Sequence, residues 1–352
     1  MRRQRGNRSL VAFGAAALII LIAAGLAAGA SSVNSPSFTK LSSGLVNYKL
    51  SKFYPPCKRK YTVFEFQAHR ADAWAQSTAQ QVKAYGASHC LKVTNQDAGG
   101  YQFVSKQLDQ LDAAIAKKPD AIILWTTDPT AVAGAVDKAR AKGIKVIGFT
   151  APPNAKTDAV VSGDWHIDGG LMVNAIAKKL GGTGDVLAIW GGAGGSYQTD
   201  LAAGADKAVK AFPNINLTTK TIPDFDPAKV QTLVQDELTR NPNLKGVITS
   251  IAVMASGAAD AIQAAGQTGK VFTVSGLIGS KANIGDITAG RIGFMVGVPS
   301  VFYSNEVVIV TANLLNGKPY PKKVIIPGQV FTADNINTPG ALKWELQPSF
   351  LK

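Results

Sequence analysis

The sequence contains few of the residues that catalysis and metal binding most often require. Among 352 residues there are two cysteines and three histidines, which fall on separate predicted loops. There is no Cys-x-x-Cys pair, no His-x-x-x-His pair, no Gly-x-Ser-x-Gly elbow and no phosphate loop ending in Gly-Lys-Ser or Gly-Lys-Thr. Carboxylates are not clustered either. These absences argue against a metal centre and a nucleophilic triad, so the sequence predicts neither an enzyme nor a cofactor.

The two cysteines, Cys57 and Cys90, precede the first and second predicted strands. In a parallel pair of strands both would lie at the same end of the sheet. A disulfide would suit an oxidising compartment and would stabilise the fold by about 3–4 kcal/mol on the loop-entropy model. Two buried free thiols are the alternative.

Basic residues outnumber acidic ones, and the net charge is +14. In a cytoplasmic protein such an excess would favour a nucleic-acid-binding function. The basic residues are scattered singly, mostly on the outer faces of predicted helices. We therefore interpret them as a solvated surface and expect no nucleic-acid partner.

The first thirty residues have the pattern of an export signal. Four arginines within Met1–Arg8 precede an uncharged apolar run, Leu10–Ala27, and Ala28-Gly29-Ala30 gives a small-residue cleavage pattern. The run is also long enough for an uncleaved anchor. Either way the pattern predicts export from the cytoplasm. Residues 31–57, rich in Ser, Asn and Lys without regular period, are predicted to be a tether.

The stretch from Cys90 to Trp125 sets the fold class. Leu91–Val93 alternates apolar and polar residues as a strand does, and Val104, Leu108, Leu111 and Ile115 lie on one helix face. Pro119 ends that helix, and Ala121–Trp125 is a continuous apolar run typical of a strand buried on both faces. Strand, helix and strand at this spacing predict a right-handed βαβ crossover in a parallel sheet, whose ligands lie at the carboxyl ends of the strands.

The same alternation occurs in two successive halves. The first half ends with a short strand, Ala159–Gly163, and the second begins with the strand Gly184–Gly191. One helix, from Val301 to Leu315, and one strand, Val324–Thr332, remain at the end. They cannot form a domain alone, so they must complete the earlier sheets. We predict two doubly wound α/β lobes and a chain that crosses between them more than once.

Four large aromatic residues fall on loops at the carboxyl ends of predicted strands: Trp74, Tyr101, Trp165 and Tyr197. Ring faces in such loops can hold apolar ligands, sugar faces or cations. Packing of each ring under its own loop is the alternative. The glycine-rich turn from Gly191 to Ser196 lacks Gly-x-Gly-x-x-Gly spacing, so we expect either a loop whose backbone lies close to a ligand or simply a tight βα turn, and not a nucleotide site.

This order of lobes, crossover and returning helix resembles the periplasmic substrate-binding proteins of the ribose-binding type (type I) over about Lys58–Phe331. Individual motifs are similar to the subset that includes the trimethylamine-N-oxide receptor: Asp97–Gln102, Gln107–Leu111, Ala188–Gly195 and Ala252–Ala259. The resemblance implies one lobe from 58–163 and 298–326, and another from 164–297 and 327–352. It also implies hinge segments at Ser162–Asp164, Gly297–Val298 and Ile326–Gly328.

The resemblance also bears on the ligand. Sugar-binding members use an Asp-Arg pair where this chain has Thr150-Ala151, and their C-lobe arginine falls on about Thr199. Unmatched sugar hydroxyls would cost about 1–3 kcal/mol each, which disfavours the usual sugar pose. Trp74, Tyr101 and Trp165 match or nearly match the aromatic box of the amine-oxide receptor, but the aromatic expected beside Trp74 is Ala73.

These features predict a receptor that traps a small ligand, sugar-like, polyol or small amine or amine oxide, between two lobes and presents it to an ABC importer. The alternative partner is a membrane sensor kinase. Trp74, Tyr101, Trp165 and Tyr197 would be the walls, with Thr150, Asp164 and Gln198 as polar contacts; Asp164 would either balance a ligand cation or cap the following helix. An enzyme on the same scaffold and a regulatory module that binds only proteins are the disfavoured alternatives.

Overall fold

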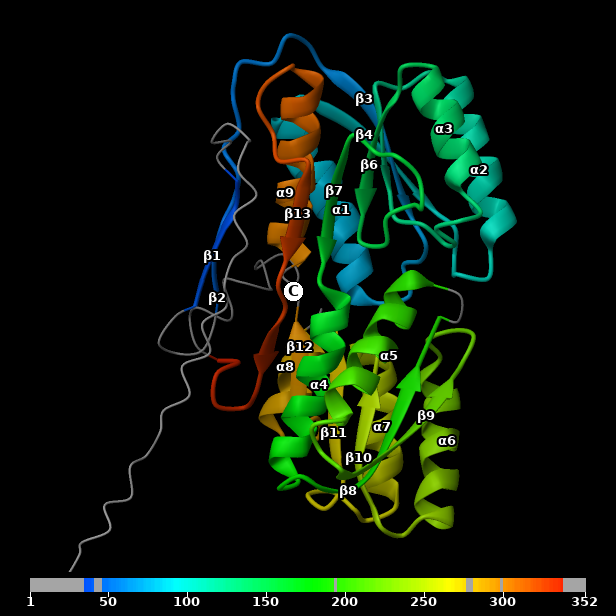
Figure 1. Ribbon diagram of the computed structural model, residues 1–352, viewed down its shortest axis with the longest axis vertical. Coiled ribbons are helices and arrows are strands. Elements are labelled where there is room, and N and C mark those ends of the chain that lie inside the picture. The colour runs from blue at the N-terminus through cyan, green and yellow to red at the C-terminus, as the bar shows by residue number, and fades with distance from the viewer. Residues whose placement is uncertain (1–34, 41–45, 193–194, 277–280, 298–299, 338–352) are drawn as a thin grey trace, which may run out of the picture. The chain divides into compact units, whose positions relative to one another are not determined.

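The computed structural model describes residues 35–40, 46–192, 195–276, 281–297 and 300–337. The predicted export signal lies outside these residues. Among the helices of the described part, none combines the length and apolar character needed to cross a membrane. The described chain forms two α/β sheets of six strands each and a small hairpin (Figure 1).

The first sheet is entirely parallel and has the order β13-β7-β6-β5-β3-β4. Its strands are β3 (Tyr61–Gln67), β4 (Leu91–Asp97), β5 (Ala121–Leu124), β6 (Lys145–Phe149), β7 (Ala159–Gly163) and β13 (Lys323–Ile326). All four residues of β5 are buried, as the continuous apolar run predicted. β4 is longer than expected, because it is an edge strand and its polar residues Asn95, Gln96 and Asp97 still pair with β3.

The second sheet has the order β14-β12-β11-β10-β8-β9 and is parallel except for the edge strand β14. Its strands are β8 (Thr183–Trp190), β9 (Asn214–Thr221), β10 (Leu244–Thr249), β11 (Phe272–Gly276), β12 (Phe294–Gly297) and β14 (Gln329–Phe331). The predicted fold class, two α/β lobes built on mostly parallel sheets, is confirmed.

Helices cover both faces of each sheet (Figure 1). On the first sheet, α1 (Ala73–Ser88) packs against α9 (Ser300–Leu315), and α2 (Val104–Ala116) packs against α3 (Ala133–Ala141). On the second, α4 (Trp165–Lys179) packs against α5 (Ser196–Val209), and α6 (Pro227–Arg240) packs against α7 (Ala252–Ala264); α8 (Lys281–Thr288) precedes β12. Apolar side chains fill the layers between helices and sheets; for example, Leu111 of α2 belongs to the same buried cluster as Phe66 of β3 and Ile122 of β5.

The prediction of one strand over Val324–Thr332 was wrong. The structure places β13 in the first sheet and β14 in the second. Pro327 and Gly328 separate them, because proline has no N–H to donate to a ladder and glycine tolerates a sharp bend.

The expectation that residues 31–57 are an irregular tether was also wrong for the described part. β1 (Ser37–Lys40) and β2 (Val46–Lys49) form an antiparallel hairpin. Tyr48 packs against Phe302 of α9, with 5.1 Å between ring centroids, and the backbone N–H of Val46 donates to Oε1 of Gln329. Aromatic contacts and long-range hydrogen bonds therefore order a segment whose polar composition predicted none.

A disulfide joins Cys57 to Cys90, with 6.3 Å between the Cα atoms. It settles the pairing left open by the sequence, because β3 and β4 are parallel neighbours and the two cysteines lie just before them.

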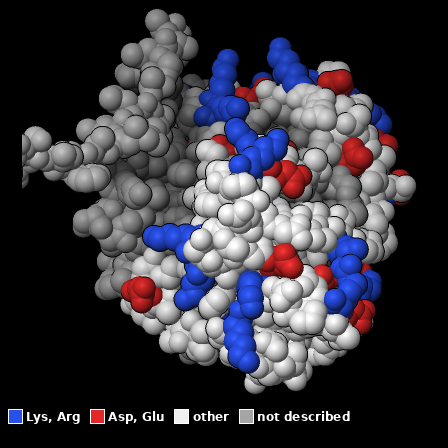
Figure 2. Space-filling model, turned by 60° about the horizontal axis from the view of Figure 1, so that its bottom comes forward, with Lys and Arg blue, Asp and Glu red and all other residues white. Residues whose placement is uncertain are grey.

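Basic side chains on the face shown in Figure 2 lie apart from one another, with acidic side chains between them. Elsewhere in the described chain several basic side chains form ion pairs, and Lys229 with Asp224, at 2.5 Å, is one of them. That distribution fits the solvated surface predicted from the sequence.

Candidate ligand-binding site

The chain passes between the two sheets at three places within or beside the described residues. The first lies between β7 and α4 and the third between β13 and β14. The second lies between β12 and α9, where the predicted hinge residue Val298 is outside the described residues. All three follow the carboxyl ends of parallel strands, which is the end of an α/β sheet where ligands bind.

All four predicted wall residues are buried, each with at most 4% of its surface exposed: Trp74, Tyr101, Trp165 and Tyr197. The structure brings Trp165 and Tyr197 together edge to face, with 4.9 Å between their ring centroids. Trp74 is not in direct ring contact with that pair. It packs instead against Tyr303 of α9 at 5.6 Å, and Tyr303 lies 6.4 Å from Trp165.

Tyr101 connects the loops of the two sheets. It follows β4 of the first sheet, and its ring lies against Gly192 and Gly195 of the second. A Cβ atom at either glycine would approach ring carbons of Tyr101 to 2.6 and 2.5 Å, respectively. The backbone of the glycine-rich turn is therefore approached closely by an aromatic ring of the protein, and its approach to a ligand stays a prediction.

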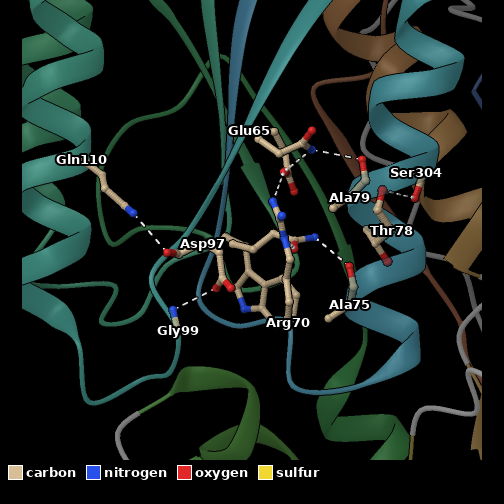
Figure 3. A network of polar contacts seen from close by, with 12 residues as sticks. Glu65, Arg70, Ala75, Thr78, Ala79, Asp97, Gly99, Gln110 and Ser304 are labelled. Atoms are coloured by element: carbon tan, nitrogen blue, oxygen red, sulfur yellow. Dashed lines mark hydrogen bonds and ion pairs between the residues drawn. The ribbon is translucent and has the colours of Figure 1, made fainter.

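A polar network beneath β3, β4 and α1 positions Tyr101 and Trp74 (Figure 3). Asp97 accepts from the backbone N–H of Gly99 at 2.8 Å and, through its carbonyl, from Nε2 of Gln110 at 3.0 Å. These bonds fix the turn that carries Tyr101. On the other side, Nε2 of Gln67 donates to the carbonyl of Ala75, one residue after Trp74.

Glu65 lies at the centre of this network, fully buried. Nδ2 of Asn95 donates to Oε2 of Glu65 at 2.8 Å and to the carbonyl of Ala79 in α1 at 3.0 Å, which ties the two strands to the helix. The Arg70 guanidinium is 3.9 Å from the same carboxylate oxygen. Burial nevertheless raises the pKa of Glu65 to about 7, because desolvation outweighs these contacts.

Thr150 lies where the predicted polar contact was expected, at the end of β6. Its φ is +58°, in the left-handed region that few non-glycine residues adopt. Its carbonyl accepts from the indole N–H of Trp165 at 2.8 Å and from the hydroxyl of Ser162 at 2.7 Å. Its own Oγ1 is buried and has no hydrogen-bond partner among the described residues.

Asp164 caps α4, because its Oδ1 accepts from the backbone N–H of Ile167 at 3.1 Å. Of the two roles weighed from the sequence, the cap is therefore present. Asp72 plays the same part for α1, accepting from Ala75 N–H at 2.9 Å. Its second carboxylate oxygen is buried without a partner among the described residues, and burial raises the pKa of Asp72 to about 6.

Gln198 is not with the four rings. It is 4% exposed and lines a separate cavity between β8, β9 and α5, beside Trp190 and Thr221. The reason is helical geometry: neighbouring residues on a helix are rotated by about 100°, so Tyr197 and Gln198 cannot face the same way.

Other aromatic groups of the site escaped the sequence reasoning. His69 packs against Phe225 of the second sheet's loops at 4.6 Å and against Trp125 at 4.8 Å, and the Trp125 indole N–H donates to the Tyr101 hydroxyl at 3.1 Å. Burial lowers the pKa of His69 to about 3, so its ring is neutral at physiological pH. The signal that points to His69 and Trp125 is their position just after β3 and β5.

Rings from both sheets therefore meet at the carboxyl ends of the strands. The described residues offer no group of three or more His, Cys, Asp or Glu side chains that could hold a metal ion. A model of the periplasmic binding protein domain family matches residues 66–319, more than half of the chain.

The chain belongs to the periplasmic binding protein family.

Among curated relatives, this periplasmic binding protein is 28% identical over 225 residues to the ribose import binding protein of Bacillus subtilis, covering 63% of this chain and 72% of the relative. It is 24% identical over 243 residues to the xylitol-binding protein of Mycolicibacterium smegmatis, covering 66% and 67%. These relatives are binding proteins and not enzymes.

Solved structures agree on the fold. An ABC transporter solute-binding protein of Agrobacterium vitis, bound with α-D-tagatopyranose, has a TM-score of 0.75 and 24% identity and covers 82% of this chain and 100% of its own. A sugar ABC transport substrate-binding protein of Bordetella parapertussis has a TM-score of 0.77 and 20% identity, covering 84% and 96%. The closer likeness to the amine-oxide receptor subset stays a prediction.

Proposed function

We propose that this protein is an exported receptor that closes on a small solute at the aromatic junction of its two lobes and delivers it to an ABC importer. The observation that carries the proposal is the meeting of Tyr101 with Gly192 and Gly195, because these groups belong to loops of different sheets. A ligand held between such loops contacts both sets of loops only in the closed form. Ligand binding therefore shifts the population toward the closed form.

The proposed walls are Trp74, Tyr101, Trp165 and Tyr197, joined by Tyr303. The proposed polar contacts are Thr150 Oγ1 and Asp72 Oδ2, since both are buried without a partner among the described residues. Asp164 keeps its cap and borders the first hinge. Gln198 leaves the set because it lines another cavity.

The ligand class proposed is a sugar or polyol. Ring faces pack against its C–H surface, and the free hydroxyl and carboxylate oxygens of Thr150 and Asp72 accept from its hydroxyl groups. The names of the ribose-binding and xylitol-binding relatives support this choice. Amines and amine oxides remain the competing class, because the same rings and the Asp72 carboxylate suit a cation.

A thermal-shift screen across pentoses, polyols, betaines and amine oxides tests the receptor. A ligand present at 100 times its Kd stabilises the folded state by about 2.7 kcal/mol, which a melting curve resolves. The double variant Trp74→Ala/Trp165→Ala should lose the shift. Phe66→Ala is the matched control, because Phe66 is a buried ring on the α2–α3 face of the first sheet and its loss lowers stability without touching the junction.

Retention of the full ligand shift in the double variant would refute the site. Deleting the gene should abolish uptake of the identified ligand at low concentration. Normal uptake, with binding intact, would instead favour a signalling partner such as a sensor kinase over an importer.

A further inference from the structure

A cavity lies at the edge of the second sheet, outside the aromatic junction. Its volume is about 370 Å³, which is within the range of small-molecule sites. It opens between the carboxyl ends of β8 and β9 and the first turns of α5, and β9 is the edge strand. The residues that line the cavity include Trp190, Gln198, Thr199, Ala202, Asp206 and Thr221.

Two buried side chains among the residues that line this cavity carry unpartnered polar atoms. Trp190 is 2% exposed and Gln198 is 4% exposed. The indole N–H of Trp190 and both the amide nitrogen and the amide oxygen of Gln198 have no hydrogen-bond partner among the described residues. Leaving each such group without a hydrogen-bond partner costs free energy. Three unpartnered polar groups on two side chains that line one cavity therefore favour a hydrogen-bond partner from outside the chain.

The cavity is separate from the aromatic junction. Tyr197 points its ring at Trp165 and donates its hydroxyl proton to the carbonyl of Ser250 at 2.8 Å. Gln198, the next residue of α5, faces β9 and Thr221. A ligand at Gln198 therefore does not replace one held by Trp165 and Tyr197.

The lining selects the chemistry of the occupant. The buried lining residues Trp190 and Gln198 carry an indole N–H, an amide NH2 and an amide oxygen, and the exposed lining residues Thr199 and Thr221 carry hydroxyl groups. Ala202 and the indole supply apolar surface. No Lys, Arg or His lines the cavity, and the one charged lining residue is the carboxylate of Asp206, so an anion has no counter-charge.

We propose that this cavity is an accessory binding site for a small neutral polyhydroxylated molecule. A hydroxyl group both donates and accepts, so adjacent hydroxyls match the indole N–H and the two ends of the Gln198 amide together. The apolar lining receives the C–H side of the same molecule. This inference goes beyond the proposed receptor function and depends on the second sheet alone.

The indole N–H signal of Trp190 in a ¹H–¹⁵N spectrum of the full-length protein provides the assay, and Trp190→Phe assigns it. Xylitol is the probe and choline chloride the comparison. We expect a saturable shift of the Trp190 signal with xylitol and none with choline. Gln198→Leu should weaken that binding about tenfold, since it removes hydrogen bonds worth about 1.4 kcal/mol. Gln231→Leu, the same change on α6 outside the cavity, should leave it unchanged.

Trp165→Ala separates the two sites: the Trp190 shift persists in this variant if the accessory site exists. The proposal would be overturned if xylitol no longer shifts the Trp190 signal in Trp165→Ala but still shifts it in Gln198→Leu. That result would assign the xylitol binding to the aromatic junction. No xylitol response at Trp190 in the wild type, or a response to choline in its place, would overturn it as well. If Gln198→Leu does not fold, Gln198→Asn, which withdraws the amide by one methylene, should give the same weakening.

Discussion

Substituting Gly195 by alanine should hold the two lobes apart without harming either of them. The backbone of Gly195 has φ −76° and ψ 135°, which alanine adopts freely, so no strain arises within its own lobe. The new Cβ would lie 2.5 Å from Cε1 of Tyr101, whereas carbon atoms pack at about 3.5–4.0 Å. The ring cannot easily yield, because it is 2% exposed and its hydroxyl accepts from Trp125.

Overpacking of this kind costs about 1–3 kcal/mol. Because only the closed form carries the clash, the cost falls on closure and should weaken ligand affinity about 5- to 150-fold. The unfolding free energy of the unliganded protein should stay within about 0.5 kcal/mol of the wild type. Isothermal titration with the ligand from the thermal screen measures the first quantity, and urea denaturation measures the second.

A double-mutant cycle makes the test specific. In a Tyr101→Ala background the clashing ring is absent, so Gly195→Ala should cause no further loss of affinity. Gly134→Ala is the matched control, because a Cβ at Gly134 of α3 meets nothing within 4 Å. Wild-type affinity in Gly195→Ala, or an equal loss in the presence and absence of the Tyr101 ring, would refute the reasoning.

Further predictions concern stability. Replacing Cys57 and Cys90 by serine opens a loop with a sequence separation of 33 and should lower the unfolding free energy by about 3–4 kcal/mol in urea melts; an unchanged midpoint would show that the disulfide does not constrain the unfolded chain. Because burial raises the pKa of Glu65 from 4.5 to about 7, the folded state binds this proton more tightly than the unfolded state does. Its stabilising contribution is complete below pH 4.5 and is lost as the pH rises to 7. Between pH 4.5 and 7, the free energy of unfolding of Glu65→Gln should therefore rise by about 3 kcal/mol relative to that of the wild type. Unfolding free energies that change in parallel with pH in the two proteins would contradict this. Thr150→Gly should raise the unfolding free energy by about 1 kcal/mol because glycine adopts φ +58° without strain; a drop of that size would show that the Thr150 side chain stabilises the fold.

Most of the fold was predictable because it depends on local patterns. The apolar run of β5 and the helical period of α2 are local, and they fixed a parallel sheet with its loops at one end. The edge strands were harder. β4 ends in polar residues and β14 is three residues long, so neither has the pattern of a buried strand.

The site was predictable only in part, for reasons that are again physical. Strand ends identified the segments that carry Trp74, Tyr101, Trp165 and Tyr197, which the structure buries. The prediction that all four lie on loops was wrong: only Tyr101 does, and the other three lie in the first turns of α1, α4 and α5. The pattern could not separate Tyr197 from Gln198, since only the rotation of α5 decides which one faces the junction. Tyr303 was missed because α9 is buried on nearly all sides, so its sequence does not mark the face that meets Trp74.

The small hairpin near the start of the described chain has a practical consequence. Tyr48 donates its hydroxyl proton to the carbonyl of Pro327, and the backbone N–H of Val46 donates to the side chain of Gln329, so the linker between β13 and β14 and the first residue of β14 each have a neighbour from far upstream. A shortened chain that begins at Lys58, where the sequence alone would place the domain boundary, strips away those neighbours. Crystallisation or biosensor experiments on such a trimmed protein would then measure lobe opening with the third crossing less constrained than in the longer chain. The longer chain is therefore the proper starting material.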